Sequence, residues 1–158
     1  MLGVQHNRQA GFTLPELIVV VAIFGILAVL AFFVLKPEDV GVQRRNSERQ
    51  TNLALIAQAL GNYHQKTGSL PDGIDTQTKA IGNDSGQVDL CKDLVPGYMS
   101  DLPMDPLYGQ VTKVDACNAE GQDYVSGYTI ERSADSSYVT LRAPNAENGV
   151  VITLTKHF

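Results

Sequence analysis

The segment that decides the fold runs from Gly11 to Leu35 and reads G-F-T-L-P-E-L-I-V-V-V-A-I-F-G-I-L-A-V-L-A-F-F-V-L. From Leu17 to Leu35 no side chain carries a charge or a hydrogen-bonding group. Since a bilayer core takes roughly 20 apolar residues at about 1.5 Å rise each, this run predicts one membrane-spanning helix. Glu16 stands out, because an unpaired charge beside hydrocarbon is costly and predicts a partner.

A short polar leader, M-L-G-V-Q-H-N-R-Q-A-G, precedes the apolar run. An ordinary secretory signal carries its apolar core before the cleavage site. Here the apolar core would follow a cut after Gly11 and would stay in the mature protein. This order separates the chain from ordinary secreted enzymes.

The residues Gly11-Phe12-Thr13-Leu14-Pro15-Glu16-Leu17, followed by the apolar run, resemble the cleavage and methylation motif of type IV pilins and pseudopilins. The resemblance implies that a prepilin peptidase cuts between Gly11 and Phe12 and that Phe12 is then N-methylated. It also implies that Glu16 meets the amino terminus of a neighbouring subunit during filament assembly. Two opposite charges that are each costly in an apolar filament core become tolerable when they pair.

The resemblance further implies a fold, a location and partners. The fold is α+β and pilin-like, with a long N-terminal helix whose second half packs on a small antiparallel β-sheet. The chain would cross the inner (cytoplasmic) membrane once, with an extracytoplasmic head, and would then enter an extracellular pilus or a periplasmic pseudopilus. Its partners would be membrane lipid, further copies in a helical homopolymer, related minor pilins, the prepilin peptidase, and an assembly ATPase with its membrane platform.

The chain then divides into four expected parts: a leader at 1–11, a membrane and assembly helix at 12–36, an amphipathic helical half at 37–67, and a β-rich head at 68–158. Pro37 predicts a bend or break near the end of the apolar run. Arg8 is outnumbered by Lys36, Arg44, Arg45 and Arg49, so the positive-inside rule alone would place the head in the cytoplasm. We follow the resemblance, which implies the opposite orientation.

The charge of the head limits its partners. Residues 67–158 hold six Lys/Arg and thirteen Asp/Glu, a net charge of −7, whereas residues 36–66 hold five and three, a net charge of +2. An acidic head is a poor general binder of nucleic acid, which needs a basic surface, although a small local basic patch stays open. No nucleic-acid partner is expected.

Periodicity predicts the elements after the anchor. Apolar residues recur at helical spacing from Leu53 to Tyr63, with Arg49, Asn52 and Gln58 between them, and Gly68 suits a helix C-cap. Residues 70–87 read as an irregular loop, and L-P-M-D-P at 102–106 as a rigid turn. Alternating patterns at 128–132, 138–142 and 150–155 predict a β-meander in a sheet of three or four strands.

Cys91 and Cys117 flank the L-P-M-D-P segment. If the head lies outside the cytoplasm, we expect a disulfide, which would stabilise the fold by about 3–4 kcal/mol in the chain-entropy model. The alternative is a pair of buried free thiols.

No catalytic or metal site is predicted. His6, His64 and His157 lie in no motif with a nucleophile or a second ligand, and we expect them to be solvated or packed. Four aspartates in loop-like sequence could in principle bind calcium, as the same region does in some major pseudopilins, but we expect solvated surface charge and no cofactor. These are Asp101, Asp105, Asp115 and Asp123.

The sequence therefore predicts a structural, non-enzymatic subunit of a type IV pilus-like filament. Within the same class, the alternatives are a type II secretion pseudopilin and a minor pilin for DNA uptake or adhesion. From another class, the alternative is a binding domain or enzyme on an uncleaved anchor.

Overall fold

The structure is a computed structural model that describes residues 12–35, 37–111, 117 and 123–158. The chain divides into two compact units, Met1–Val40 and Gly41–Phe158. Each unit is described by itself below.

The first unit contains helix α1, Leu14–Leu35. Its residues Leu14–Phe32 form a stretch of 19 residues that is long and apolar enough to cross a membrane, and none of this stretch is buried inside the structure. An apolar helix that buries no face against its own chain needs lipid or another helix around it. The bend or break predicted near Pro37 involves residue 36, which lies outside the described residues, so it stays a prediction.

Helix α2, Pro37–Thr67, presents the predicted apolar stripe. Leu53, Ile56 and Leu60 have no solvent exposure. Gly68 ends the helix with a φ of 74°, and its N–H donates to the carbonyl of His64 at 2.8 Å, which confirms the predicted glycine cap.

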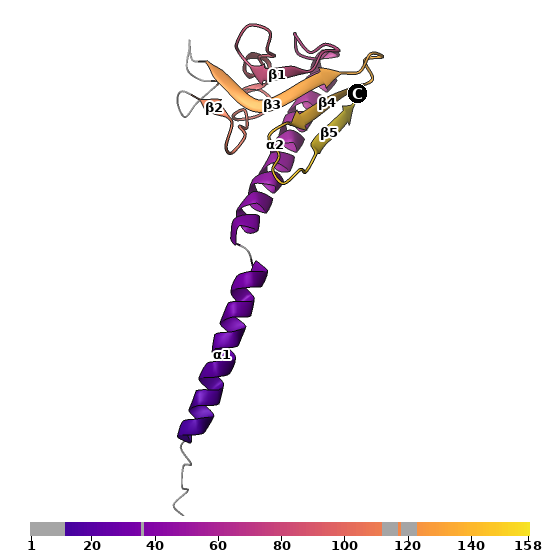
Figure 1. Ribbon diagram of the computed structural model, residues 1–158. Coiled ribbons are helices and arrows are strands. Elements are labelled where there is room, and N and C mark those ends of the chain that lie inside the picture. Colours follow the sequence, from indigo (N-terminus) through magenta and orange to yellow (C-terminus); the bar gives the residue numbers. More distant parts are fainter. Residues whose placement is uncertain (1–11, 36, 112–116, 118–122) are drawn as a thin grey trace, which may run out of the picture. The chain divides into compact units, whose positions relative to one another are not determined.

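The head contains one antiparallel sheet in the order β1-β3-β4-β5, and a fifth strand, β2, also pairs with β3 (Figure 1). The three predicted strands of the meander are present, as β3 at Tyr124–Arg132, β4 at Tyr138–Ala143 and β5 at Ile152–His157. They pair in sequence order, with Ile130 opposite Leu141 and Leu141 opposite Leu154. The remaining short elements are β1 at Lys79–Gly82, α3 at Cys91–Leu94 and β2 at Gln110–Val111.

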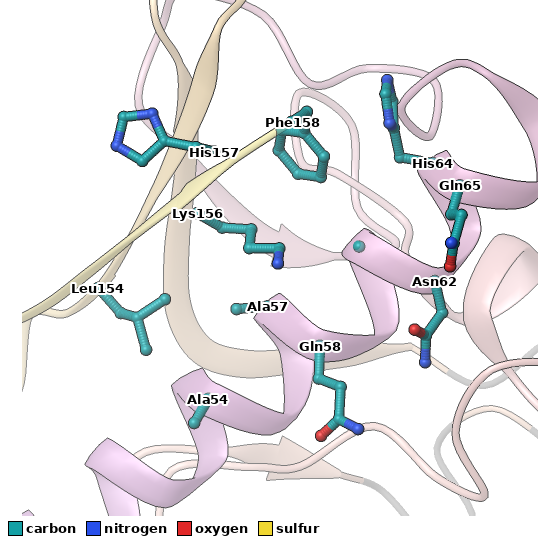
Figure 2. A pocket seen from close by; sticks show the side chains of 11 residues that line it. Ala54, Ala57, Gln58, Asn62, His64, Gln65, Leu154, Lys156, His157 and Phe158 are labelled. Atoms are coloured by element: carbon teal, nitrogen blue, oxygen red, sulfur yellow. The ribbon is translucent and has the colours of Figure 1, made fainter.

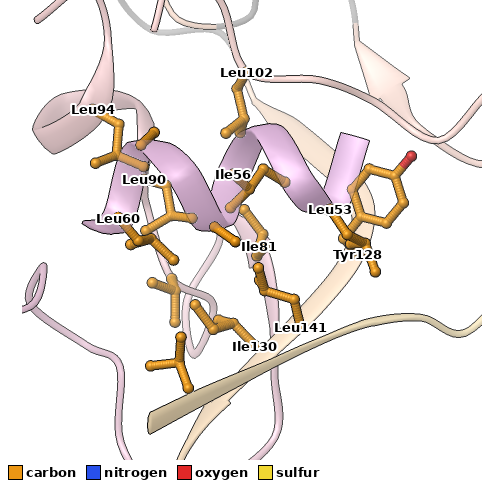
Figure 3. Close-up of a cluster of buried hydrophobic side chains, with 14 of the residues drawn as sticks. Leu53, Ile56, Leu60, Ile81, Leu90, Leu94, Leu102, Tyr128, Ile130 and Leu141 are labelled. Atoms are coloured by element: carbon orange, nitrogen blue, oxygen red, sulfur yellow. The ribbon is translucent and has the colours of Figure 1, made fainter. Parts of the chain in front are cut away.

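The hydrophobic core lies between α2 and the sheet (Figure 3). Alternate side chains of β3 are buried, including Tyr128 and Ile130, as the period of two requires for a strand with one face on a helix. Segments outside the regular elements close the core with further apolar side chains, namely Val88, Leu90 and Leu102. This packing confirms the predicted pilin-like α+β class.

The prediction that residues 70–87 are wholly irregular is wrong. Strand β1 lies within this range and pairs with β3, with Lys79 opposite Ile130 and Ala80 opposite Thr129. The buried residues of β1 are the neighbours Ile81 and Gly82, and only Ile81 has a side chain to bury, so the strand shows no alternating apolar pattern. The sheet also exceeds the predicted three or four strands, because β2 adds two residues beside β3.

Candidate functional site

The residues predicted to act in processing and assembly lie at the start of α1. Phe12 lies two residues before the helix with 82% of its surface exposed, and Glu16 lies exposed in the first helical turn. Gly11 lies outside the described residues. The predicted cut between Gly11 and Phe12 would leave Phe12 as the first residue, four positions before Glu16.

Thr13 and Glu16 form the N-terminal cap of α1. The first intrahelical hydrogen bond runs from the Leu17 N–H to the Thr13 carbonyl at 3.1 Å. The Glu16 carboxylate accepts from both the backbone N–H and the hydroxyl of Thr13, each at 3.4 Å. A glutamate three positions after the cap residue, reaching back to its N–H, is the carboxylate half of a capping box. The sequence signal, T-x-x-E, was present but was not used in the prediction.

Both hydrogen bonds to Glu16 are long, since strong ones of this kind lie near 2.9 Å. Among the described residues, Thr13 is the one that donates hydrogen bonds to the Glu16 carboxylate. The cap therefore holds the carboxylate loosely near the helix N-terminus, where the macrodipole also favours negative charge. A free amine nearby would offer it a stronger, charge-assisted bond.

Cys91 and Cys117 are joined by a disulfide with a Cα–Cα distance of 5.1 Å, which confirms the predicted bridge. Cys91 begins helix α3 and is buried in the core. The bond ties α3 to Cys117, which follows β2 in the chain.

Arg49 and Asp105 form a buried ion pair that the sequence analysis missed. Both side chains have 0% solvent exposure, and the guanidinium donates to the carboxylate twice, at 2.7 and 3.1 Å. Asp105 also accepts the N–H groups of Leu107 and Tyr108, at 2.9 and 3.0 Å. The prediction that Asp105 is a solvated surface charge is therefore wrong, and Arg49, placed among the polar positions of the helix, lies in the core.

Glu147, in the loop between β4 and β5, completes this cluster. Its carboxylate accepts from Arg45 at 2.6 and 2.7 Å and from Arg49 at 2.8 Å. Its backbone N–H and carbonyl both bond to the side-chain amide of Asn46. Charge-assisted hydrogen bonds thus join three segments that are distant in sequence: α2, the segment around Asp105 and the β4–β5 loop.

The pKa values of the cluster follow from these contacts. Burial alone would raise the pKa of Asp105, but the hydrogen bonds from Arg49, Leu107 and Tyr108 outweigh it, and the pKa is lowered. Hydrogen bonds from Arg45 and then Arg49 lower the pKa of Glu147 to about 2. The hydrogen bond to Asp105 raises the pKa of Arg49. The cluster is therefore fully ionised at neutral pH.

Three of the other candidate side chains, His64, His157 and Asp101, belong to the second unit. His64 packs against the ring of Phe158 with centroids 4.9 Å apart, and His157 packs against Tyr138 at 5.3 Å. Asp101 is exposed and caps the N–H of its neighbour Leu102. His6 and Asp115 lie outside the described residues. Within the described ranges, no group of three or more His, Cys, Asp or Glu could hold a metal ion.

Comparison with known families gives a match at the N-terminal end of the chain. The family model described as "Prokaryotic N-terminal methylation motif" matches residues 6–32. This range contains the predicted cleavage point, the capping pair and most of α1. No curated protein and no solved structure matches the chain.

Proposed function

We propose, from the premise that this chain carries the N-terminal methylation motif that defines the type IV pilin and pseudopilin family, that it is a structural subunit of a type IV pilus-like filament. As a prepilin-type protein it undergoes processing at its N-terminus and is anchored through one apolar helix. Proteins of this family are typically not enzymes. The observation that carries the proposal is Glu16, a carboxylate at the start of an exposed apolar helix with one loosely bound local partner.

The proposed processing supplies a second partner for this carboxylate. Peptidase cleavage between Gly11 and Phe12 creates an amine at Phe12, which is then methylated. The amine and Glu16 are each costly to bury alone in an apolar environment, and their pairing between neighbouring subunits removes that cost. Processing would thus switch on assembly.

The exposed apolar surface of α1 supports a filament core made of helices. Helices from many copies can pack side by side when each leaves the membrane, because no face of Leu14–Phe32 is used inside the chain. A contact of one surface with a different surface on the next copy does not close into a ring, and such contacts generate helical fibres. The prepilin peptidase, an assembly ATPase and a membrane platform are the partners that this route needs.

The disulfide supports an extracytoplasmic head. Disulfides persist in the periplasm and outside the cell, whereas cytoplasmic thiols are kept reduced. The Cys91–Cys117 bridge therefore favours the orientation implied by the motif over the one given by the count of flanking basic residues.

A variant that removes the charge of Glu16 tests the proposed role of this residue. Glu16→Gln keeps an acceptor for Thr13 but removes the charge, so we expect normal membrane insertion and no sheared filaments. Glu48→Gln is the matched control, because Glu48 is an exposed carboxylate on α2 outside the motif, and it should assemble as the wild type does. Filaments from Glu16→Gln at the wild-type level would remove the proposed role of this residue.

A further inference from the structure

A trough of about 460 Å³ runs between helix α2 and the edge strand β5 in the head (Figure 2). Its α2 side is formed by small residues, Ala54, Ala57 and Gly61, and its β5 side by Leu154, Lys156 and Phe158. Because these residues have small side chains or none, they leave open space between the helix and the strand.

Lys156 occupies a position that normally belongs to the core. Ile152 and Leu154 precede it on the same face of β5, and Ile152 is 5% exposed. In Figure 2 the lysine side chain points from β5 toward α2. A Cβ at Gly61 would lie 2.9 Å from Cε and 3.3 Å from Nζ of Lys156. The absence of a side chain at Gly61 therefore leaves room for the end of the Lys156 side chain beside the helix.

The trough holds a lysine on a head whose net charge is negative. Its lining includes Lys156 and no Asp or Glu side chain. Within the described residues, no carboxylate forms an ion pair with Lys156, whereas Lys79, Arg45, Arg49 and Arg142 are all paired. The trough thus holds an ammonium that forms no ion pair with any residue in the part of the chain that the structure describes.

Filament formation would bring many such heads together. Residues 67–158 carry a net charge of −7, so neighbouring heads repel unless opposite charges meet. Exposed carboxylates that could meet a lysine include Asp84 and Asp101, which form no ion pair in the described part of the chain. Complementary potentials of this kind fix which surfaces meet and in which register.

We propose that the α2–β5 trough is a docking surface for a second copy of this chain, and that Lys156 receives an exposed carboxylate of that copy's head. This inference rests on the proposed filament function and adds a head-to-head contact to the pairing at Glu16. The trough supplies the cation, and the acidic head of the neighbour supplies the anion.

Zero-length crosslinking of filaments with a carbodiimide tests this contact, because the reagent joins an amine to a carboxylate only when the two touch. We expect dimers of the full chain in which Lys156 is linked to an Asp or Glu peptide. Lys156→Arg keeps the positive charge without a reactive amine, so it should form filaments but lose this crosslink. Lys156→Gln should form fewer filaments, which dissociate at lower salt than wild-type filaments do.

Lys92→Gln provides the matched control, since Lys92 is exposed on α3 and lies outside the trough. This variant should assemble and crosslink through Lys156 as the wild type does. Amine acylation gives a second readout: Lys156 should be protected in filaments relative to detergent-solubilised monomers.

Two results would overturn the inference while leaving the proposed function intact. One is filament formation by Lys156→Gln with wild-type yield and salt resistance. The other is equal acylation of Lys156 in filaments and monomers with no Lys156 crosslink. A wild-type chain that forms no filaments in cells with the full assembly machinery would instead remove the proposed function, and this contact with it.

Discussion

Arg49 and Asp105 lie 56 positions apart in sequence and form an ion pair with neither side chain exposed to solvent. The pair joins the helix that carries the head to the L-P-M-D-P segment, and Glu147 extends it to the β4–β5 loop. Full burial is acceptable only because the two charges are paired and hydrogen-bonded. The head is therefore fastened to α2 by charge as well as by its apolar core.

Replacing Arg49 should destabilise the head strongly. Arg49→Met leaves the buried carboxylate of Asp105 without its counter-ion, and breaking a buried pair in this way costs about 3–5 kcal/mol. Chemical unfolding of the full chain in detergent micelles, followed by near-UV circular dichroism of the tyrosines, measures this. All six tyrosines lie between position 63 and position 138, so the signal reports on the second unit, Gly41–Phe158, alone.

The double variant Arg49→Met with Asp105→Asn is the control. The asparagine carries no charge and still offers an oxygen to the N–H groups of Leu107 and Tyr108. We expect the double variant to be more stable than Arg49→Met alone. If the double variant loses as much stability as Arg49→Met and Asp105→Asn lose in sum, the two residues act independently.

Acid should weaken the head through the carboxylates bound to arginine. A carboxyl group whose pKa is lowered by folding contributes stability above its unfolded pKa, and this contribution is lost as the pH falls through the folded value. The pKa of Glu147 falls from 4.5 to about 2 and that of Glu131 to about 2, mainly through hydrogen bonds from Arg45 and Arg142 respectively. The free energy of unfolding should therefore fall between about pH 4.5 and pH 2.

A Glu147→Gln variant isolates its share of this acid sensitivity. Its stability should be lower than that of the wild type at pH 7, and the difference should shrink as the pH approaches 2. Parallel stability curves for the two proteins from pH 7 to pH 2 would contradict the assigned role of Glu147.

Gly127 should not tolerate a side chain. Its φ is 84°, and an added Cβ would lie 2.6 Å from the Cβ of Asp105, where the backbone of β3 approaches the ion pair. Gly127→Ala should therefore cost more than about 1 kcal/mol, since strain and overpacking add. Gly97→Ala is the control, because a Cβ there meets no atom within 4 Å; equal stability of the two variants would show that Gly127 has room.

The Cys91–Cys117 disulfide should stabilise the head by roughly 3–4 kcal/mol, the value that the chain-entropy model gives for closing a loop of this size. The Cys91→Ser, Cys117→Ser double variant should unfold at correspondingly lower denaturant concentration. Labelling of the unreduced wild type with a thiol reagent should modify neither cysteine, and rapid modification of both would contradict the bridge.

The sequence was sufficient where the signal is local. The apolar run of α1, the stripe from Leu53 to Leu60, the cap at Gly68 and the three strands of the meander each follow from spacing within one segment. The same local logic could have found the Thr13–Glu16 cap, because T-x-x-E is visible without a fold.

The sequence was insufficient where a residue's role depends on a distant partner. Arg49 and Asp105 each look like surface residues, since isolated arginines and aspartates are rarely buried, and only the fold brings them together. Strand β1 was missed for a similar reason. Its four residues contain one fully buried apolar side chain, and its place in the sheet comes from pairing with β3.

The central claim is that processing creates the amine that Glu16 needs, and intact-mass and peptide mass spectrometry of the chain purified from cells with an active prepilin peptidase tests it most directly. The account predicts a mature amino terminus at Phe12 that carries one added methyl group. A chain that retains Met1 or the full leader in those cells would contradict it, because no free amine would then lie one helical turn before Glu16.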